Sequence, residues 1–250
     1  MCRAGNNRGI TILELIISMF ISSVVISGAY RLYNDLSKRM DHEAESALVY
    51  TDLITVSSMI ERDFRVAGYN LPGNGIKKRD ENGIAELLIF TNQQNVRTAA
   101  ASQTQAGERT ISLHNTDGFS VGDWICITAM ASPEYHQISA VGTTGTITIE
   151  QGVSGTVPAG SLVYKADGVR YYIDEEREAL FREMKGNSYL VSNRIEVLEL
   201  VAKDTDGQII TGDFSQTRAV SISLGSVIRS AGTERLVTES TEVNIRNVNL

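Results

Sequence analysis

The sequence has few of the residues that cross-link a chain or interrupt its helices. Of its 250 residues only two are cysteines, Cys2 and Cys126, and only three are prolines. A disulfide framework or a zinc site needs several cysteines at short spacing, so both are excluded. Because the first proline is Pro72, no proline ring interrupts a helix before that position.

Positive charge is also scarce. The chain has 23 Lys and Arg against 30 Asp and Glu, a formal net charge of -7, and its basic residues are scattered apart from the run KKR at 77–79. A surface that binds nucleic acid needs clustered Lys and Arg to replace the counterions of the phosphates. The composition therefore argues against nucleic acid as a partner, while 42% hydrophobic residues suffice for a sizeable core.

Apolar residues are concentrated near the N-terminus. Residues 10–27 are mostly Ile, Leu, Val, Met and Phe, and Glu14 is the only charge among them. Continued to Tyr30, the run is long enough at about 1.5 Å per residue to span a hydrocarbon layer of about 30 Å. It predicts a transmembrane segment at 10–30, with a cleaved secretory signal or an ordinary signal anchor as alternatives. A carboxylate inside such a segment costs about 2.5–3.5 kcal/mol, so it usually has a partner and a function.

The stretch RGITILE at 8–14 resembles the class III signal of type IV prepilins. In that signal a short basic leader ends in Gly, and the acid is the fifth residue after the cut. The resemblance implies that residues 1–9 are a leader peptide, which prepilin peptidase removes between Gly9 and Ile10 on the cytoplasmic face. It also implies N-methylation of Ile10 by the same enzyme. This family usually has Phe where Ile10 stands, and Ile keeps the position apolar.

The resemblance gives Glu14 a role in assembly. In the family this glutamate is thought to pair with the N-terminal amine of a neighbouring subunit in the fibre. An ion pair in a low dielectric recovers much of what the isolated charge costs. We therefore expect Glu14 to set subunit pairing and not to act as a catalyst.

Beyond Tyr30 the sequence becomes polar but keeps a helical repeat over 31–67. Its apolar residues recur every three or four positions, which marks one buried helix face: Leu32, Leu36, Met40 and Ala44, then Val49, Leu53, Val56, Ile60 and Phe64. We predict one continuous helix from Ile10 to Ala67, about 85 Å long. Gly68 and Pro72 are typical of its C-terminal stop.

The remainder, 68–250, has short alternating runs separated by turn residues, which predicts an antiparallel β-rich head. The expected strands lie at 86–91, 109–114, 121–129, 134–141, 145–150, 161–166, 169–174, 178–184, 195–203, 217–224 and 235–245. We expect a surface loop at 94–108, which marks where an inserted β-module at about 109–165 begins. The predicted fold class is α+β and pilin-like, a long N-terminal helix packed on this head.

Two further stretches narrow the resemblance. IERDFRVAGYN at 60–70 and the closing strands, with Arg246-Asn247 near their end, are similar to PilW-type minor pilins. The pseudopilin J of type II secretion shares the long helix and β-rich head and is the nearest alternative. Both resemblances imply an inner-membrane protein with a periplasmic head that joins a fibre. The resemblance to a minor pilin also implies other minor pilins and the major pilin as partners. After processing Cys126 would be alone and could not form the C-terminal disulfide of many major pilins, which favours a minor subunit or a pseudopilin.

Other possible chemistry has simpler explanations. Cys126 and His136 could form a nucleophilic pair, but a thiol in a strand core explains Cys126 better. The three histidines His42, His114 and His136 show no ligand spacing, and we expect them on the surface. No Gly-rich phosphate loop and no paired catalytic acids are found, so we expect no enzyme, cofactor or small-molecule substrate. A signal-anchored periplasmic enzyme or binding protein is the alternative of another class.

Two acidic residues near the C-terminal end resemble the start of a calcium-binding loop. Asp204 and Asp206 have the DxDG form that begins calcium loops, but the glutamate that such a loop needs further on is missing. A hairpin turn explains them without metal. We also expect Asp117-Gly118 and Asp167-Gly168 to form turns.

Overall fold

The computed structural model describes residues 12–81, 84–129, 133–210, 217–230 and 233–245. The chain divides into two compact units, residues 1–48 and 49–250. Helix α1, Ile12–Arg65, begins in the first unit and ends in the second. The second unit holds all the strands, so the predicted α+β fold with one long helix and an antiparallel β-rich head is confirmed.

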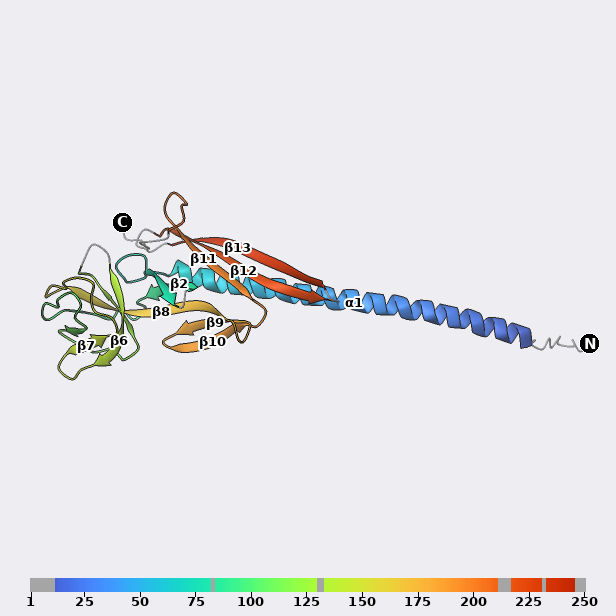
Figure 1. Cartoon of the computed structure of the whole chain (residues 1–250), viewed down its shortest axis with the longest axis horizontal. Coiled ribbons are helices and arrows are strands. Elements are labelled where there is room, and N and C mark those ends of the chain that lie inside the picture. Colours follow the sequence, from blue (N-terminus) through green and yellow to red (C-terminus); the bar gives the residue numbers. More distant parts are fainter. Residues whose placement is uncertain (1–11, 82–83, 130–132, 211–216, 231–232, 246–250) are drawn as a thin grey trace, which may run out of the picture. The chain divides into compact units, whose positions relative to one another are not determined.

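The strands form two antiparallel sheets (Figure 1). One contains β1 (Ile76–Glu81), β2 (Ile84–Thr91), β3 (Arg97–Ala99), β4 (Thr110–Ser112), β5 (Trp124–Ile127), β6 (Glu134–Val141), β7 (Thr146–Ile149), β8 (Leu162–Asp174), β9 (Ala179–Met184) and β10 (Asn187–Ser192). The other contains β11 (Val197–Lys203), β12 (Ala219–Ser230) and β13 (Thr233–Asn244). Figure 1 shows the smaller sheet running along the C-terminal part of α1.

The core of the head is built on one face of α1. The buried residues of this face are Val49, Leu53, Val56, Ile60 and Phe64, as the three- and four-residue spacing predicts. They share a cluster with Val169 and Leu180 of the larger sheet and Val220 and Ile222 of the smaller one. Both sheets therefore bury apolar side chains against the same helix face.

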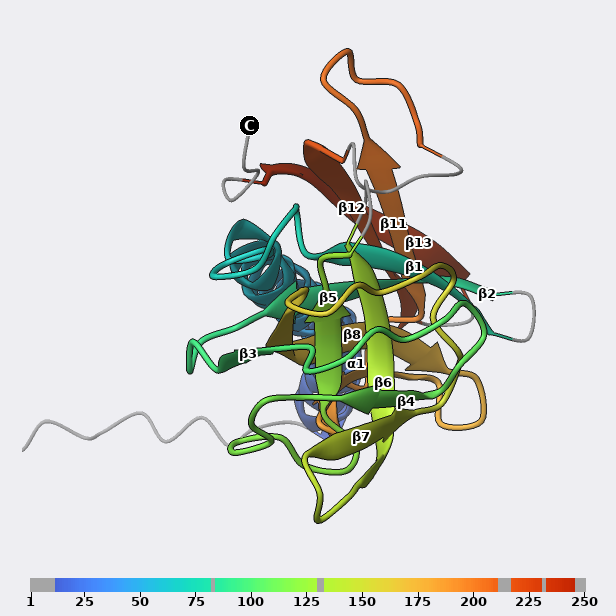
Figure 2. The same ribbon diagram turned by 90° about the vertical axis from the view of Figure 1, so that its left-hand side faces the viewer.

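Part of the larger sheet closes into a ring with a core of its own. The first half of β8 pairs with β3 and β5, and the ladder continues through β6 and β7 to β4. The bridge Ala100–Leu113 joins β4 back to β3. Figure 2 shows these strands wrapped around one another. Alternate side chains of each strand fill the interior of the ring. In β7, for example, Ile147 and Ile149 are buried while their threonine neighbours are half-buried.

Helix α1 stops where its end is hydrogen-bonded to the sheet. Gly68 has a positive φ of 74°, and its amide donates to the Phe90 carbonyl at 2.9 Å. The Phe90 amide donates to the Gly75 carbonyl at 2.7 Å. A Cβ on Gly75 would lie 2.1 Å from the Gly68 nitrogen, so only glycine fits there. Helix α1 ends at Arg65, two residues before the predicted end at Ala67, and Gly68 lies in the turn that follows it.

Several strand predictions were wrong in detail. The separate strands expected at 161–166 and 169–174 are one strand, β8, so Asp167-Gly168 is not a turn. Gly168 is needed for packing instead, because a Cβ there would lie 3.0 Å from Trp124 and 3.1 Å from Phe90. The expected loop at 94–108 contains β3, and β1 and β10 were not predicted. All three missed strands are fixed by pairing with a neighbour and lack an apolar alternation of their own.

A polar clamp joins the last turn of α1 to the larger sheet. Asp63 Oδ2 accepts from the Tyr171 hydroxyl at 2.6 Å and from Arg182 Nε at 2.9 Å. Burial raises the pKa of Tyr171 and the Asp63 carboxylate raises it further, so the hydroxyl keeps the proton that it donates. Burial would lower the pKa of Arg182, but Asp63 outweighs burial and raises it. The Arg182 guanidinium therefore stays charged, and the Tyr171 hydroxyl stays protonated, across the ordinary pH range.

The buried helix face predicts a sharp contrast between two isoleucines of α1. Ile60 is 0% exposed and Ile54 is 59% exposed. We expect Ile60→Ala to lower the free energy of unfolding by about 3 kcal/mol through a cavity, and Ile54→Ala to change it by less than about 0.5 kcal/mol. Urea unfolding of the full chain in detergent, followed by the fluorescence of Trp124, measures both. Equal losses in the two variants would contradict the packing described.

The clamp predicts a second contrast on the same helix. Asp63→Asn leaves Arg182, which is mostly buried, without its anionic partner, and we expect a loss of about 2 kcal/mol in the free energy of unfolding. Glu61 pairs with Arg65 on the exposed side of α1, so Glu61→Gln should cost less than about 0.5 kcal/mol. The same unfolding experiment compares them, and a harmless Asp63→Asn would show that the clamp does not hold the helix.

Candidate functional site

The N-terminal part of α1 exposes apolar side chains on all sides. From residue 12 to residue 26 the exposed large apolar residues are Ile12, Leu13, Leu15, Ile16, Ile17, Met19, Phe20, Ile21, Val24, Val25 and Ile26. Within the described residues, α1 is the one helix long and apolar enough to cross a membrane, judged by length and composition. A helix that is apolar all round is stable only when lipid or other helices cover it. This apolar surface is therefore suited to contact with lipid or with other helices.

Two hydroxyl groups of this segment are hydrogen-bonded within the helix. Ser18 Oγ donates to the Glu14 carbonyl at 2.8 Å, and Ser27 Oγ donates to the Ser23 carbonyl at 2.7 Å. Such bonds to the carbonyl four residues earlier let a serine lie in an apolar medium without a water partner. These two serines therefore do not oppose burial of the segment.

Glu14 lies in the first described turn of α1, and its side chain is exposed. A carboxylate at a helix N-terminus interacts favourably with the helix dipole. Gly9 and Ile10 lie outside the described residues, so cleavage between them and methylation of Ile10 stay predictions. The pairing of Glu14 with a neighbouring amine likewise stays a prediction.

The amphipathic stripe that follows is only partly buried. We expected one buried face from Leu32 onward, but Leu32, Leu36, Met40 and Ala44 are exposed. The buried face begins at Val49, the first helix residue in the core of the head. A three- and four-residue repeat shows which side of a helix is apolar, but not what covers it.

Cys126 and His136 do not form a nucleophilic pair. In the ladder of β5 and β6, Cys126 is opposite Tyr135, whereas His136 is opposite Ile125. Neighbouring residues of a strand point to opposite faces of a sheet, so the thiol and the imidazole are on different sides. Burial raises the pKa of the Cys126 thiol to about 12, despite a hydrogen bond with Tyr135 that lowers it. A thiol with that pKa is not a nucleophile near neutral pH.

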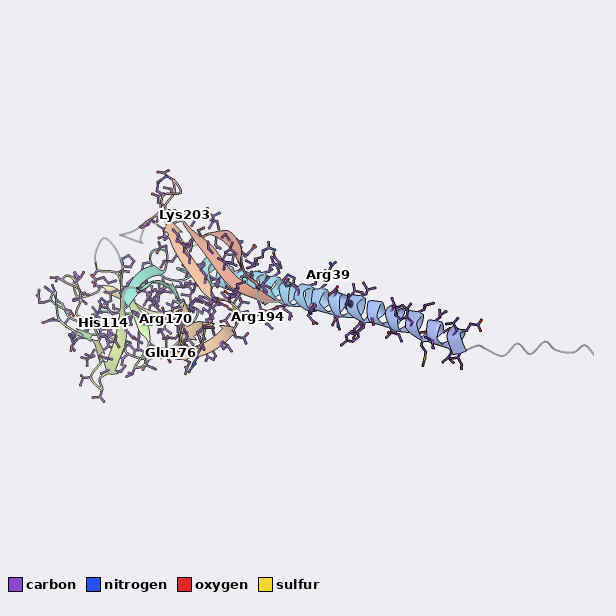
Figure 3. The ribbon with its side chains drawn as sticks, turned by 45° about the vertical axis from the view of Figure 1, so that its right-hand side comes forward. Arg39, His114, Arg170, Glu176, Arg194 and Lys203 are labelled. Carbon is purple, nitrogen blue, oxygen red and sulfur yellow. The ribbon has the colours of Figure 1, made fainter. Side chains whose placement is uncertain are left out.

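The histidines differ from one another. His42 and His114 are exposed, as expected, and Figure 3 labels His114 among the strands of the ring. The prediction that His136 lies on the surface was wrong, because it is 8% exposed. It is buried beside Glu134, whose Oε2 lies 3.0 Å from His136 Nε2 and accepts from the Ser154 amide at 3.1 Å. Burial would raise the pKa of Glu134, but the bonds from Ser154 and His136 outweigh it and leave that pKa lowered.

The Asp204 region forms a turn, as expected. Asp204 Oδ1 accepts from the amides of Asp206 and Gln208 at 2.9 and 2.8 Å, and Lys203 bridges to Ile209. This use of an aspartate oxygen is typical of a hydrogen-bonded turn. Across the described part of the chain, no group of three or more His, Cys, Asp and Glu side chains could hold a metal ion.

A hollow beside the end of α1 is lined by charged residues of both signs. Asp63 and Arg182 of the clamp face it, as do Asp167 and Lys185. Lys185 Nζ lies 3.1 Å from Asp167 Oδ1, so each acid is paired with a base. Groups paired in this way fix the surrounding strands and do not supply a general acid or base.

Comparison with known protein families identifies one motif in this chain. Residues 5–30 match the family model of the prokaryotic N-terminal methylation motif. No curated protein matches the chain. The matched residues cover the expected cleavage site, Glu14 and the membrane-capable part of α1. Proteins with this motif are structural and not catalytic. The chain thus carries the prepilin-type motif of type IV pilin-like proteins on a pilin-like α+β fold.

Proposed function

We propose that the chain is a minor type IV pilin of the PilW type that primes or joins pilus assembly. The observation that carries the proposal is the exposed apolar surface of α1 within residues that match the methylation motif. Lipid covers this surface before assembly, and the helices of other subunits cover it afterwards. The head is periplasmic while the helix is in the inner membrane, and it then becomes part of the fibre or its tip.

Cleavage of the leader creates an N-terminal amine that can pair with a Glu14 carboxylate. Prepilin peptidase cuts after Gly9, which removes the leader 1–9, and it methylates the amine of Ile10. The Glu14 carboxylate of one subunit then pairs with that amine on the next subunit, either the major pilin or another minor pilin. Because the pair forms in a low dielectric, a subunit without either charge is disfavoured in the fibre.

The chain is organised around this helix. The transmembrane half is 10–30, the amphipathic half is 31–67, and the β-rich head is 68–250. We also propose that about 109–165 is a module inserted into a simpler head. It is supported by the separate apolar core inside the ring, which includes Ile111, Ile138 and Val163.

The N-terminal mass of the protein tests the proposal directly. We expect a chain that starts at Ile10, with a methylated amine, in membranes that contain prepilin peptidase. In membranes without the peptidase we expect the intact leader. A chain that keeps Met1 in the presence of the peptidase, or one that starts beyond Gly28, would falsify the proposal and would favour a signal-anchored periplasmic protein.

Glu14→Val separates cleavage from assembly. We expect normal leader cleavage, because the peptidase recognises the leader and its glycine, but a loss of the chain from sheared pili of about ten-fold or more, because the intersubunit ion pair is gone. Glu43→Val is the control, since Glu43 lies on the same helix outside the apolar run. Normal incorporation of the Glu14 variant contradicts the pairing role. A wild-type chain found only in a type II secretion pseudopilus would support the pseudopilin alternative instead.

A further inference from the structure

Strand β10 is an edge strand with β9 as its one neighbour in the described structure. The hairpin turn between them is Lys185-Gly186, with positive φ values of 54° and 74°, which is the type I′ geometry of a two-residue hairpin. The pair that closes such a turn exchanges both hydrogen bonds, and the pattern then alternates. The backbone groups of Ser188 and Leu190 therefore point away from β9, where no described strand lies.

This edge carries no charge, unlike the other open edges of the described sheets. Strand β10 reads NSYLVS, whereas the edge strand β1 reads IKKRDE. The edges β11 and β13 also carry charged residues, among them Glu199 on β11 and Glu234 and Arg235 on β13. Charged residues on an edge strand prevent other chains from pairing with it. Strand β10 lacks that protection.

Two apolar side chains of this edge are exposed, one on each face of the sheet. Tyr189 is 52% exposed and Leu190 is 60% exposed. Leu190 is opposite Phe181 in the ladder, and Phe181 stacks with Tyr172 at 5.8 Å between ring centroids. An added strand would cover Leu190 beside this aromatic pair and Tyr189 on the other face.

Strand β10 is also held in place before any partner arrives. The Tyr172 hydroxyl and Ser188 Oγ are hydrogen-bonded at 3.0 Å, and Ser192 Oγ donates to Asp52 of α1 at 3.1 Å. At the hairpin end, Lys185 is paired with Asp167. A strand fixed at both ends loses little entropy when another strand pairs with it.

We propose that β10 is a docking edge for an extended segment of another subunit, free of charged side chains, which adds beside β10 as a further strand. The proposal rests on the assembly function proposed above. Ser188 and Leu190 each present one amide and one carbonyl, so the segment gains main-chain hydrogen bonds as well as contacts with Tyr189 and Leu190. A charged side chain on the added strand would lie against Tyr189 or Leu190 and lose hydration, so the edge favours an uncharged segment.

A second copy of β10 fits this edge less well. Antiparallel pairing of two copies through Ser188 and Leu190 would bring Lys185 of each chain to within one residue of Arg194 of the other. Figure 3 labels Arg194 just after β10. Each of these cations already has an acidic partner, Lys185 with Asp167 and Arg194 with Asp52, so pairing two copies would gain no new contact between opposite charges. A different subunit is therefore the occupant that we test, and pairing of two copies is the contrary outcome.

A photo-crosslinking amino acid, p-benzoylphenylalanine, in place of Tyr189 of the full-length chain tests the proposal in assembling cells. We expect an adduct whose crosslinked peptide, identified by mass spectrometry, is an uncharged extended segment of another fibre subunit. Leu190→Lys should reduce that adduct about ten-fold or more, because the added strand would bury an unpaired charge.

Leu236→Lys is the matched control, since Leu236 is 55% exposed on the charged edge β13, and it should leave the adduct unchanged. The proposal would be overturned if the adduct formed equally well in the Leu190→Lys variant, or if Leu236→Lys reduced it as much as Leu190→Lys. An adduct that joins two copies of β10 would also overturn it. The N-terminal mass is read in the same samples. An uncut leader contradicts the proposed function, whereas a correctly cut chain without the expected adduct contradicts the docking edge alone.

Discussion

Burial of one face of α1 is the interaction that joins the two sheets of the head. The face from Val49 to Phe64 touches apolar residues of both sheets, and each such side chain contributes about 1.5–3 kcal/mol when it is removed from water. Neither sheet has another described helix to cover it. The same helix continues towards the N-terminus with apolar side chains that the chain leaves exposed. One element therefore supplies both the core of the head and the long apolar surface that the chain leaves exposed.

Polar contacts make this arrangement specific. Apolar packing alone sets the position of a helix on a sheet less sharply than a directional hydrogen bond does, and Asp63 has one position in which it meets both Tyr171 and Arg182. Asp52 makes a similar contact with Ser192 and Arg194 at the end of β10. These bonds fix the register between helix and sheet.

The local elements were predictable where a repeat was strong. The buried positions of α1, the stop at Gly68 and strands such as β6 and β9 follow from periodicity and turn residues. Strands β1 and β10 were not predicted, because a neighbour's backbone fixes them and their side chains do not alternate. Asp167-Gly168 resembles a turn, yet the glycine is there because Trp124 and Phe90 leave no room for a Cβ. Nothing near Asp63 in the sequence indicates Arg182, which lies more than a hundred residues away.

The sequence by itself determined the N-terminal motif, the apolar run with its carboxylate at Glu14, and the α+β class, because these depend on composition and on spacing along a few turns. Only the tertiary structure decided that Cys126 and His136 point to opposite faces, that His136 is buried, and that the stripe at Leu32, Leu36 and Met40 is left exposed. Those facts depend on which segments pair across long stretches of chain. A local pattern carries no information about such pairing, because burial is a property of the neighbours that the fold supplies.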